Sequence, residues 1–220
     1  MYINFIKRLF DIVLSFIGLI LLSPILIPIM IILALTGEKE IFYFQKRKGQ
    51  GNRDFYVWKF ATMDKNSPNI GAGIITLADD PRVTTVGKYL RQSKINELPQ
   101  LINVFKGDMS LVGPRPLLQK SFDLYPAEVQ DEIYQNKPGI TGIGSLIFRD
   151  EERIVANSDN PRKTYESIFP YKGELELWYL KNISILTDVL IIFLTVWLVI
   201  SPNSNMAYKI FKDLPKKKFE

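Results

Sequence analysis

The stretch Ser93–Leu101, SKINELPQL, places a carboxylate beside a carboxamide between apolar residues. Glu97 can carry negative charge, move a proton or bind a hard metal ion, whereas Asn96 offers only neutral polar atoms. The chain contains no Cys and no His, which excludes thiolate chemistry, disulfides and imidazole as base or zinc ligand. Its chemistry therefore has to use carboxylates, amines, guanidinium groups, hydroxyls or a metal ion held by oxygen.

A second candidate is Arg115, which lies between Pro114 and Pro116 in the run GDMSLVGPRP. Proline fixes the backbone angle φ, so the arginine side chain starts from a rigid platform. Its planar guanidinium fork suits phosphate, which it can bind through two parallel hydrogen bonds. An ordinary proline-rich turn would have the same sequence, so this run alone does not identify a phosphate site.

The length and charge of the chain set broad limits. It has 220 residues and a formal net charge of +5, which suits one domain of ordinary size with appendages. A modest basic excess fits an anionic partner such as phosphate, a nucleotide or a lipid surface, and it equally fits a surface kept soluble by charge. Glycine-rich phosphate-loop and dinucleotide motifs are absent from the sequence, so an ordinary nucleotide-binding fold is not indicated.

The candidate residues lie on recognisable elements. The aromatic runs 41–44 and 55–60 flank the polar, glycine-bearing segment 46–53, a pattern that predicts a β-hairpin with a longer basic turn. Downstream, apolar residues recur at helical spacing from Leu98 to Phe105. We therefore expect Glu97 in the first turn of a helix that ends near Gly107.

The first forty residues contain an uncharged run, Ile12–Leu35. As a straight helix it would reach roughly 36 Å, enough to cross a hydrocarbon core of about 30 Å. Ser23-Pro24 lies in the middle of the run and favours a break into two arms. Basic residues flank the run on both sides and prefer the cytoplasm, which favours a hairpin that enters and leaves by one face. A proline-kinked single span is the alternative.

The end of the chain is apolar again. Val189–Ile200 would reach only roughly 18 Å as a helix, which is too short to span a bilayer. We predict that Asp188 caps this helix and that the helix lies in, or near, the membrane interface. Lysines between 209 and 218 can contact anionic headgroups, and a disordered basic tail is the alternative.

Seven motifs occur in an order that resembles the bacterial sugar transferase family, the small monotopic phosphoglycosyl transferases. The resemblance covers nearly the whole chain, and the combination is specific although each motif alone is not. The motifs are Lys7–Asp11 (KRLFD), Ser23-Pro24, Lys59–Met63 (KFATM), Asp80–Thr84 (DPRVT), Glu97–Leu101 (ELPQL), Lys106–Pro116 (KGDMSLVGPRP) and Pro138–Gly142 (PGITG).

With the patterns above, the resemblance implies a fold that is mainly α with a small β-hairpin. It implies a monotopic membrane protein on the cytoplasmic face of the bacterial inner membrane, with interfacial amphipathic helices. Residues 1–40 would form a re-entrant helix hairpin broken at Ser23-Pro24, residues 41–182 a cytosolic catalytic domain, and residues 183–220 an interfacial helix with a basic tail.

The resemblance also implies a reaction. A sugar 1-phosphate would pass from a nucleoside diphosphate sugar, usually a UDP-sugar, to polyprenyl (undecaprenyl) phosphate with the aid of Mg²⁺. The products would be polyprenyl-diphosphate-sugar and UMP, in the first membrane step of surface glycan assembly, such as that of exopolysaccharide or lipopolysaccharide. Membrane phospholipid is a further expected partner, nucleic acid is not, and a homodimer is left open.

In the family an Asp-Glu pair does the chemistry, and the Asp attacks the β-phosphorus to form a phosphosugar-enzyme. By motif match Glu97 takes the second acidic position and would bind the metal together with position 96. Arg115, Lys59, Arg82 and Arg91 would then be phosphate-binding residues. A covalent intermediate would let two polyanionic substrates react in turn.

Two departures from the family pattern follow. Asn96 stands where the family has its nucleophilic Asp, and a carboxamide is a poor nucleophile and a weaker magnesium ligand. Three explanations compete: the chain was altered to block the first step, Glu97 has taken over the attack, or activity is lost. A chain without activity would be a membrane-bound protein that only binds a nucleotide sugar or lipid phosphate. The second departure is Ile143–Arg149, where many members carry a Trp and an Asn-Gly-Arg.

Overall fold

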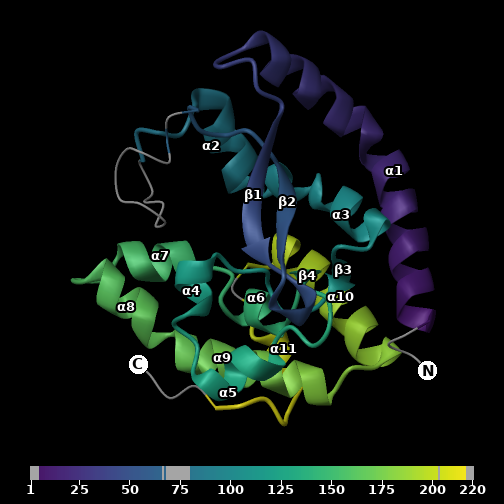
Figure 1. The fold of residues 1–220 in the computed structure, drawn as a ribbon, viewed down its shortest axis with the longest axis vertical. Helices are drawn as coiled ribbons and strands as arrows, with labels where there is room; N and C mark the ends of the chain where they lie inside the picture. The colour runs from purple at the N-terminus through teal and green to yellow at the C-terminus, as the bar shows by residue number, and fades with distance from the viewer. Residues whose placement is uncertain (1–4, 66, 68–79, 203, 217–220) are drawn as a thin grey trace.

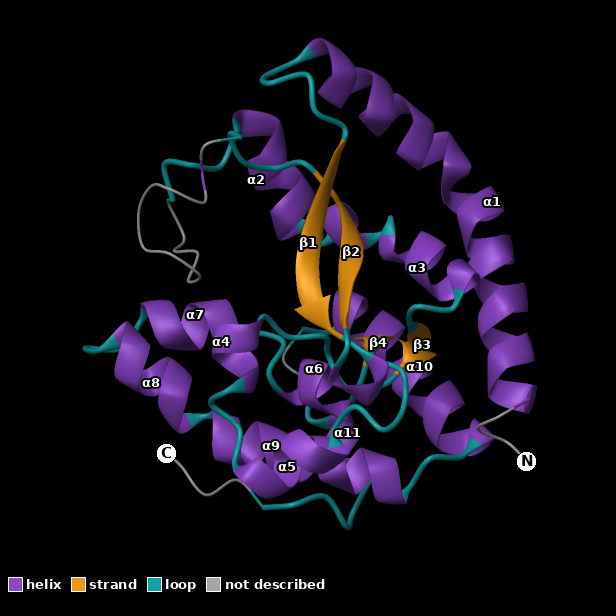
Figure 2. Cartoon of the chain, viewed as in Figure 1, coloured by secondary structure: helices purple, strands orange, loops and turns teal. Residues whose placement is uncertain are grey.

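The computed structural model describes residues 5–65, 67, 80–202 and 204–216, and within them the chain is mainly helical, as predicted. This described part has two small sheets, the predicted hairpin and an unpredicted parallel pair, β3–β4. In Figures 1 and 2 the hairpin β1–β2 stands at the centre, the long helix α1 arches along one side, and shorter helices lie beside and below the hairpin. The elements are α1 (Lys7–Leu35), β1 (Phe42–Lys48), η2 (Gln50–Asn52), β2 (Asp54–Phe60), α2 (Thr85–Gln92), η4 (Ile95–Glu97), α3 (Gln100–Lys106), β3 (Ser110–Val112), α4 (Gln119–Phe122), α5 (Ala127–Glu132), β4 (Gly139–Thr141), α6 (Ile143–Ile147), α7 (Glu151–Ala156), α8 (Pro161–Ser167), α9 (Phe169–Lys181), α10 (Ile185–Ile200) and α11 (Met206–Ile210).

Helix α1 is long and apolar enough to cross a membrane, judged by length and composition, and only five of its 29 residues are buried. The predicted break into two arms at Ser23-Pro24 is wrong, because the helix is continuous through both prolines and only curves (Figure 1). Ser23 Oγ donates a hydrogen bond of 2.7 Å to the carbonyl of Ile20. Pro24 has no N–H to donate to that carbonyl, as a helical residue at its position normally would. The Ser23 hydroxyl therefore takes the place of the missing backbone donor.

The predicted β-hairpin is confirmed. Strands β1 and β2 pair antiparallel, with Phe42 opposite Phe60 and Lys48 opposite Asp54. The turn between them places Gly51 and Asn52 at positive φ, a conformation that these two residue types adopt most readily. Because side chains alternate between the two faces of a strand, this register decides which residues share a face at the site.

Glu97 does not lie in the first turn of a long helix, as predicted, but ends the separate 3₁₀ turn η4. Pro99 has no backbone N–H to donate back to Ile95, so the chain tightens to i→i+3 bonds instead, including Leu98 N to Ile95 O at 3.1 Å. Helix α3 follows and ends at Gly107 in the left-handed conformation, as predicted.

Helix α3 is attached to the hairpin through one buried side chain. Asn103 accepts a hydrogen bond from the N–H of Trp58 at 2.9 Å and donates to the carbonyl of Tyr56 at 2.8 Å. Its carboxamide thus satisfies backbone groups on β2 that a third strand would otherwise pair. The attachment fixes the segment just after Glu97 against the strand that carries Lys59.

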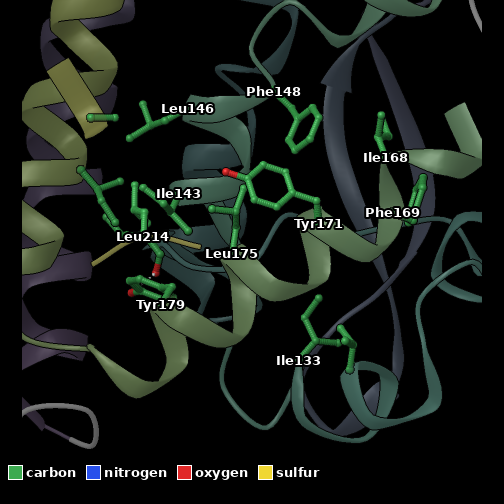
Figure 3. Packing of buried hydrophobic residues seen from close by; sticks show 14 of the residues in the cluster. Ile133, Ile143, Leu146, Phe148, Ile168, Phe169, Tyr171, Leu175, Tyr179 and Leu214 are labelled. Atoms are coloured by element: carbon green, nitrogen blue, oxygen red, sulfur yellow. Dashed lines mark hydrogen bonds between the residues drawn. The ribbon is translucent and has the colours of Figure 1, made fainter. Parts of the chain in front are cut away.

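The main hydrophobic core lies beneath the hairpin and is centred on α9. In Figure 3 the side chains of Tyr171 and Leu175 project from α9 towards the side on which Ile143 and Leu146 of α6 lie, and Tyr179 belongs to the same cluster. Helix α10 closes this core with one face and leaves a second face of large apolar side chains exposed.

The prediction that Asp188 caps the last apolar helix is wrong. Helix α10 begins earlier, at Ile185, with Ser184 as its N-cap. Asp188 is 1% exposed and forms an ion pair with Lys7 of α1 and a hydrogen bond of 2.7 Å with Tyr179. These partners offset the cost of burying the carboxylate, which is why the helix can extend past it.

Candidate active site

Glu97 is the centre of the polar cluster that the fold assembles. Lys59 Nζ lies 3.0 Å from Glu97 Oε1, and Arg115 Nη2 lies 2.8 Å from the same oxygen. The three residues come from η4, from β2 and from the segment after β3. The structure therefore joins three of the predicted site residues, although they are far apart in the sequence.

The charge state of Glu97 follows from these neighbours. Burial raises the pKa of the carboxyl, but the charges and hydrogen bonds of Arg115 and Lys59 outweigh it and hold the pKa well below its usual value. Burial lowers the pKa of Lys59 to about 8, against the favourable charge of Glu97. At neutral pH the pair is therefore a carboxylate and an ammonium.

Arg47 joins this cluster, and sequence reasoning missed it because the segment from 46 to 53 was read as a turn. Its Nη2 donates to Gln45 Oε1 at 2.6 Å and its Nη1 to the carbonyl of Pro116 at 3.1 Å. Burial and the nearby charge of Arg115 lower its pKa to about 10, so it stays charged. The signal that could have found it is strand alternation, since positions 43, 45 and 47 share a face with 55, 57 and 59.

The Pro114-Arg115-Pro116 turn is rigid on several sides. The carbonyl of Arg115 accepts from Tyr134 Oη at 2.7 Å, and Tyr134 Oη accepts from the N–H of Leu117 at 3.0 Å. Gly113 and Gly139 lie so close that a Cβ on Gly139 would stand 2.1 Å from the nitrogen of Gly113. The platform predicted from the two prolines is thus completed by tertiary contacts.

Beneath this turn lies a carboxylate that the sequence did not single out. Glu176 of α9 is 1% exposed and accepts a hydrogen bond from the backbone N–H of Arg115. Burial raises its pKa to about 7, although the charge of Lys172 opposes the shift. Within the described residues its Oε2 has no hydrogen-bond partner.

A small cleft lies over the cluster. It is lined by Arg47, Val57, Lys59, Gln100, Arg115 and Pro116. Three cationic side chains meet one carboxylate there, so the cleft carries an excess of positive charge. Such a surface suits a ligand with more than one negative charge, and a diphosphate is the simplest example.

Arg82 and Arg91 form a second basic group. Arg82 holds Asp80 through two hydrogen bonds, Nε to Oδ1 at 2.8 Å and Nη2 to Oδ2 at 2.5 Å. The charge of Arg91, in the last turn of α2, also lowers the pKa of Asp80, after the larger effect of the Arg82 hydrogen bonds. Among the contacts of the described residues, this group is organised around Asp80 and not around Glu97.

Asn96 is buried beside Glu97, and its Oδ1 lacks a hydrogen-bond partner within the described residues. The same part of the chain holds no group of three or more acidic side chains that could bind a metal. Magnesium is often held by one or two carboxylates together with water and substrate phosphates. By donor type alone, the Asn96 carboxamide oxygen and the Glu97 carboxylate would suit a magnesium ion that takes its other ligands from water and a diphosphate.

Residues 2–202 match the family model described as "Bacterial sugar transferase". The chain is 38% identical over 194 residues to a UDP-N-acetylgalactosamine-undecaprenyl-phosphate N-acetylgalactosaminephosphotransferase of Aeromonas hydrophila, a match covering 87% of this chain but only 43% of that relative. It is 30% identical over 204 residues to the exopolysaccharide production protein ExoY of Sinorhizobium fredii, covering 86% of this chain and 83% of ExoY. It is 37% identical over 191 residues to the uncharacterized sugar transferase EpsL of Bacillus subtilis, covering 87% and 85%.

Proposed function

The chain belongs to the bacterial sugar transferase family, and from this premise we propose that it transfers a sugar 1-phosphate from a UDP-sugar to undecaprenyl phosphate and releases UMP. The names of its relatives support the substrate classes, since the Aeromonas protein is named for a UDP-sugar and for undecaprenyl phosphate. The observation that carries the proposal is the cleft in which Arg47, Lys59 and Arg115 outnumber Glu97.

The cations bind the donor diphosphate in this scheme. Arg115 presents a fork that now holds Glu97, and Lys59 holds the same carboxylate. When a diphosphate enters the cleft, the two side chains can move their hydrogen bonds to phosphate oxygens, which are the more highly charged acceptors. This exchange neutralises the phosphates and frees the Glu97 carboxylate within the cleft.

Glu97 is the nucleophile in the proposed reaction, because Asn96 beside it is a neutral carboxamide. A Glu97 oxygen forms a bond to the β-phosphorus, and the bond from that phosphorus to the bridging oxygen breaks, so UMP leaves with the electron pair. An oxygen of undecaprenyl phosphate then attacks the same phosphorus and releases Glu97 as a carboxylate. Glu97 and Asn96 Oδ1 would hold Mg²⁺, which supplies charge neutralisation on the diphosphate when bound.

The chain is associated with a membrane in this proposal, as its long apolar helix suggests. Exposed apolar side chains run along α1 and along the outer face of α10, and these surfaces are the ones proposed to meet lipid: Leu9, Val13, Phe16, Ile17, Leu21, Ile31, Leu186, Val189, Phe193, Val196 and Val199. The curved α1 would dip into one leaflet from the cytoplasmic face of the inner membrane and return, with phospholipid around it. A homodimer stays a prediction, which the mass of the purified protein in nanodiscs checks.

The activity test uses the full chain in nanodiscs with undecaprenyl phosphate, Mg²⁺ and a panel of UDP-sugars. The wild type is expected to release UMP with at least one sugar and to form a lipid-linked product. Glu97→Gln should abolish both and leave no adduct, whereas the matched control Glu166→Gln, at an exposed ion pair, should behave like the wild type. A phosphosugar adduct mapped to a residue other than Glu97 would contradict the assignment of the nucleophile.

A second candidate function is favoured by Asn96. If the missing Asp abolishes the first step, the protein binds a nucleotide sugar or lipid phosphate without converting it. The wild type would then bind UDP-sugar and release no UMP with any sugar, and Asn96→Asp would restore release. UMP release by the wild type excludes this function.

Membrane topology has its own test. Because the chain has no Cys, single cysteines introduced as Phe5→Cys and Lys39→Cys would be the only reactive thiols. Re-entry predicts that a membrane-impermeant maleimide labels both sites from the cytoplasmic side. Labelling from opposite sides would show that α1 spans the bilayer.

A further inference from the structure

The beginning of α1 differs from the rest of the helix. Lys7, Asp11 and Ser15 are buried and follow one another at intervals of four, so they form a single polar stripe. The remaining surface of the helix is mainly exposed and apolar. The stripe faces the domain that carries the candidate site, and each charged residue near it has a defined partner there.

Asp11 holds the strand that leads to Arg115. Its Oδ1 accepts a hydrogen bond from Ser110 Oγ at 3.0 Å and another from the N–H of Leu111 at 2.9 Å. Both donors belong to β3, which ends immediately before the Gly113-Pro114-Arg115 turn. Two hydrogen bonds to one buried carboxyl oxygen restrain both donors, so this contact fixes the start of the segment on which Arg115 is mounted.

Arg8 holds the helix that follows Glu97. Its Nη1 donates to the carbonyl of Val104 at 2.7 Å and its Nη2 to the carbonyl of Phe105 at 2.8 Å. These carbonyls lie in the last turn of α3, where a cation is favoured, and the Val104 carbonyl also accepts from the N–H of Gly107 at 3.1 Å. Because α3 is short, fixing its end also restrains the η4 turn at its start.

Lys7 completes the attachment. It pairs with Asp188 of α10, and Tyr179 Oη lies 3.3 Å from Lys7 Nζ, 2.7 Å from Asp188 Oδ1 and 3.2 Å from the carbonyl of Val112. The buried pair therefore reaches the last residue of β3 as well. Our sequence interpretation counted Lys7 and Arg8 as flanking charges that set topology, whereas the structure engages both in tertiary contacts.

We propose that Lys7, Arg8 and Asp11 are positioning residues that set the relative placement of Glu97 and Arg115, so that α1 is part of the framework of the site as well as the part that meets lipid. The two catalytic segments are joined to each other through one helical turn of α1. A displacement of that turn changes the geometry of the cleft without touching a cleft residue. The inference rests on the proposed function only for the nature of the anion that the cleft binds.

The test compares Asp11→Ala and Asp11→Asn with Asp123→Ala and Asp123→Asn. Asp123 is an exposed aspartate whose side chain accepts a hydrogen bond from Gln119, one turn earlier in the chain. Hydrogen exchange of the full chain in nanodiscs is followed by mass spectrometry. Asp11→Ala should speed exchange about tenfold in peptides covering 108–118, in line with the loss of charge-assisted bonds. Exchange in the hairpin, 42–60, should stay unchanged. Asp11→Asn keeps an acceptor oxygen and should recover most of the protection.

The second measurement is binding of inorganic pyrophosphate. Asp11→Ala should weaken it about tenfold, Asp11→Asn should weaken it less, and both Asp123 variants should match the wild type. Faster exchange throughout the chain, unchanged exchange in 108–118, or a local change with unaltered pyrophosphate affinity would each overturn the inference. If the wild type binds no pyrophosphate, the proposed function fails while the exchange measurement still decides the positioning role.

The Lys7 contact needs a paired variant, because Lys7→Met leaves a buried carboxylate alone and can prevent folding. In Lys7→Met/Asp188→Leu neither charge remains, so the fold should recover. The positioning role predicts that this double variant has wild-type exchange in 127–181 but faster exchange in 108–118. Full protection of 108–118 in the folded double variant would contradict a role for the pair.

Discussion

Two glutamates contact Arg115, the half-buried Glu97 on its side-chain side and the buried Glu176 on its backbone side, and they show opposite pKa shifts. Glu97 contacts the guanidinium and Lys59, and these cations keep its pKa well below the usual value despite burial. Glu176 accepts the backbone N–H of Arg115, and burial raises its pKa to about 7 against the opposing charge of Lys172. The difference teaches that burial raises the pKa of a carboxyl, whereas direct contacts with cations from distant segments lower it.

The largest expected effect on activity comes from replacing Glu97, the ionised glutamate. Glu97→Gln should lower UMP release by about a thousandfold or more, because the nucleophile is lost. The same change should strengthen binding of inorganic pyrophosphate, because Lys59 and Arg115 no longer have a carboxylate to hold. Isothermal titration in nanodiscs measures the affinity, and Glu166→Gln is the control. Weaker pyrophosphate binding in Glu97→Gln would contradict the exchange of cations from carboxylate to phosphate.

Glu176, the glutamate with the raised pKa, should make the stability of the protein depend on pH. The folded-state pKa of Glu176 is about 7 against 4.5 for the free group, so between these values the folded state holds a proton that the unfolded state has lost. The free energy of unfolding should therefore fall as pH rises from 5 to 8, by on the order of 3 kcal/mol.

Glu176→Gln tests this assignment. The amide cannot titrate but keeps an oxygen for the N–H of Arg115, so the Tm of the variant should change less between pH 5 and 8 than that of the wild type. Glu128→Gln, on the exposed side of α5, is the matched control. Equal pH dependence in wild type and Glu176→Gln would show that Glu176 is ionised throughout.

A smaller effect is expected from replacing Arg47, because it is one of the three cations that give the cleft its excess of positive charge. Arg47→Met should weaken pyrophosphate binding about tenfold, because one charge-assisted contact is lost. Arg162→Met removes a cation from an exposed ion pair and should leave the affinity unchanged. An Arg47→Met variant with wild-type affinity would place the ligand over Lys59 and Arg115 alone.

The cluster around the Arg115 side chain could be predicted from the sequence, whereas Glu176 at its backbone could not. Glu97, Lys59 and Arg115 were named in advance because they lie in short motifs and carry the charges that phosphate chemistry needs. Glu176 lies in a helix of ordinary composition, and nothing local distinguishes it from a surface glutamate. Its pKa depends on burial beneath the Arg115 turn, which is a property of the tertiary structure.

The same distinction between local and long-range features separates the parts of the fold that could be predicted from those that could not. Aromatic runs around a glycine-bearing turn predicted the hairpin, because strand propensity and turn chemistry act over a few residues. The pairing of Lys7 with Asp188 spans 181 positions, so the sequence suggested a cap and a flanking charge where the structure has an ion pair. Ser23-Pro24 was read as a break, since its effect depends on whether a hydroxyl repairs the lost hydrogen bond.

The smallest expected effect comes from the space around Glu176. A Cβ on Gly144 would stand 2.3 Å from Glu176 Oε1, so Gly144→Ala must push the carboxyl aside. Overpacking of this kind costs about 1–2 kcal/mol when a side chain can shift, and Tm should fall accordingly. Glu176→Ala removes the obstructing carboxyl, so combining it with Gly144→Ala should cost less than the sum of the single changes.

This pair of changes also probes the link between the two carboxyls. If the displaced Glu176 no longer accepts the Arg115 N–H, the turn loosens and pyrophosphate binding through the Arg115 side chain should weaken, by about twofold to fivefold. Stability lost with unchanged pyrophosphate affinity would mean that the two sides of Arg115 are independent. In that case the rigidity of the turn comes from its prolines and Tyr134, and Glu176 has no part in setting the geometry at Glu97.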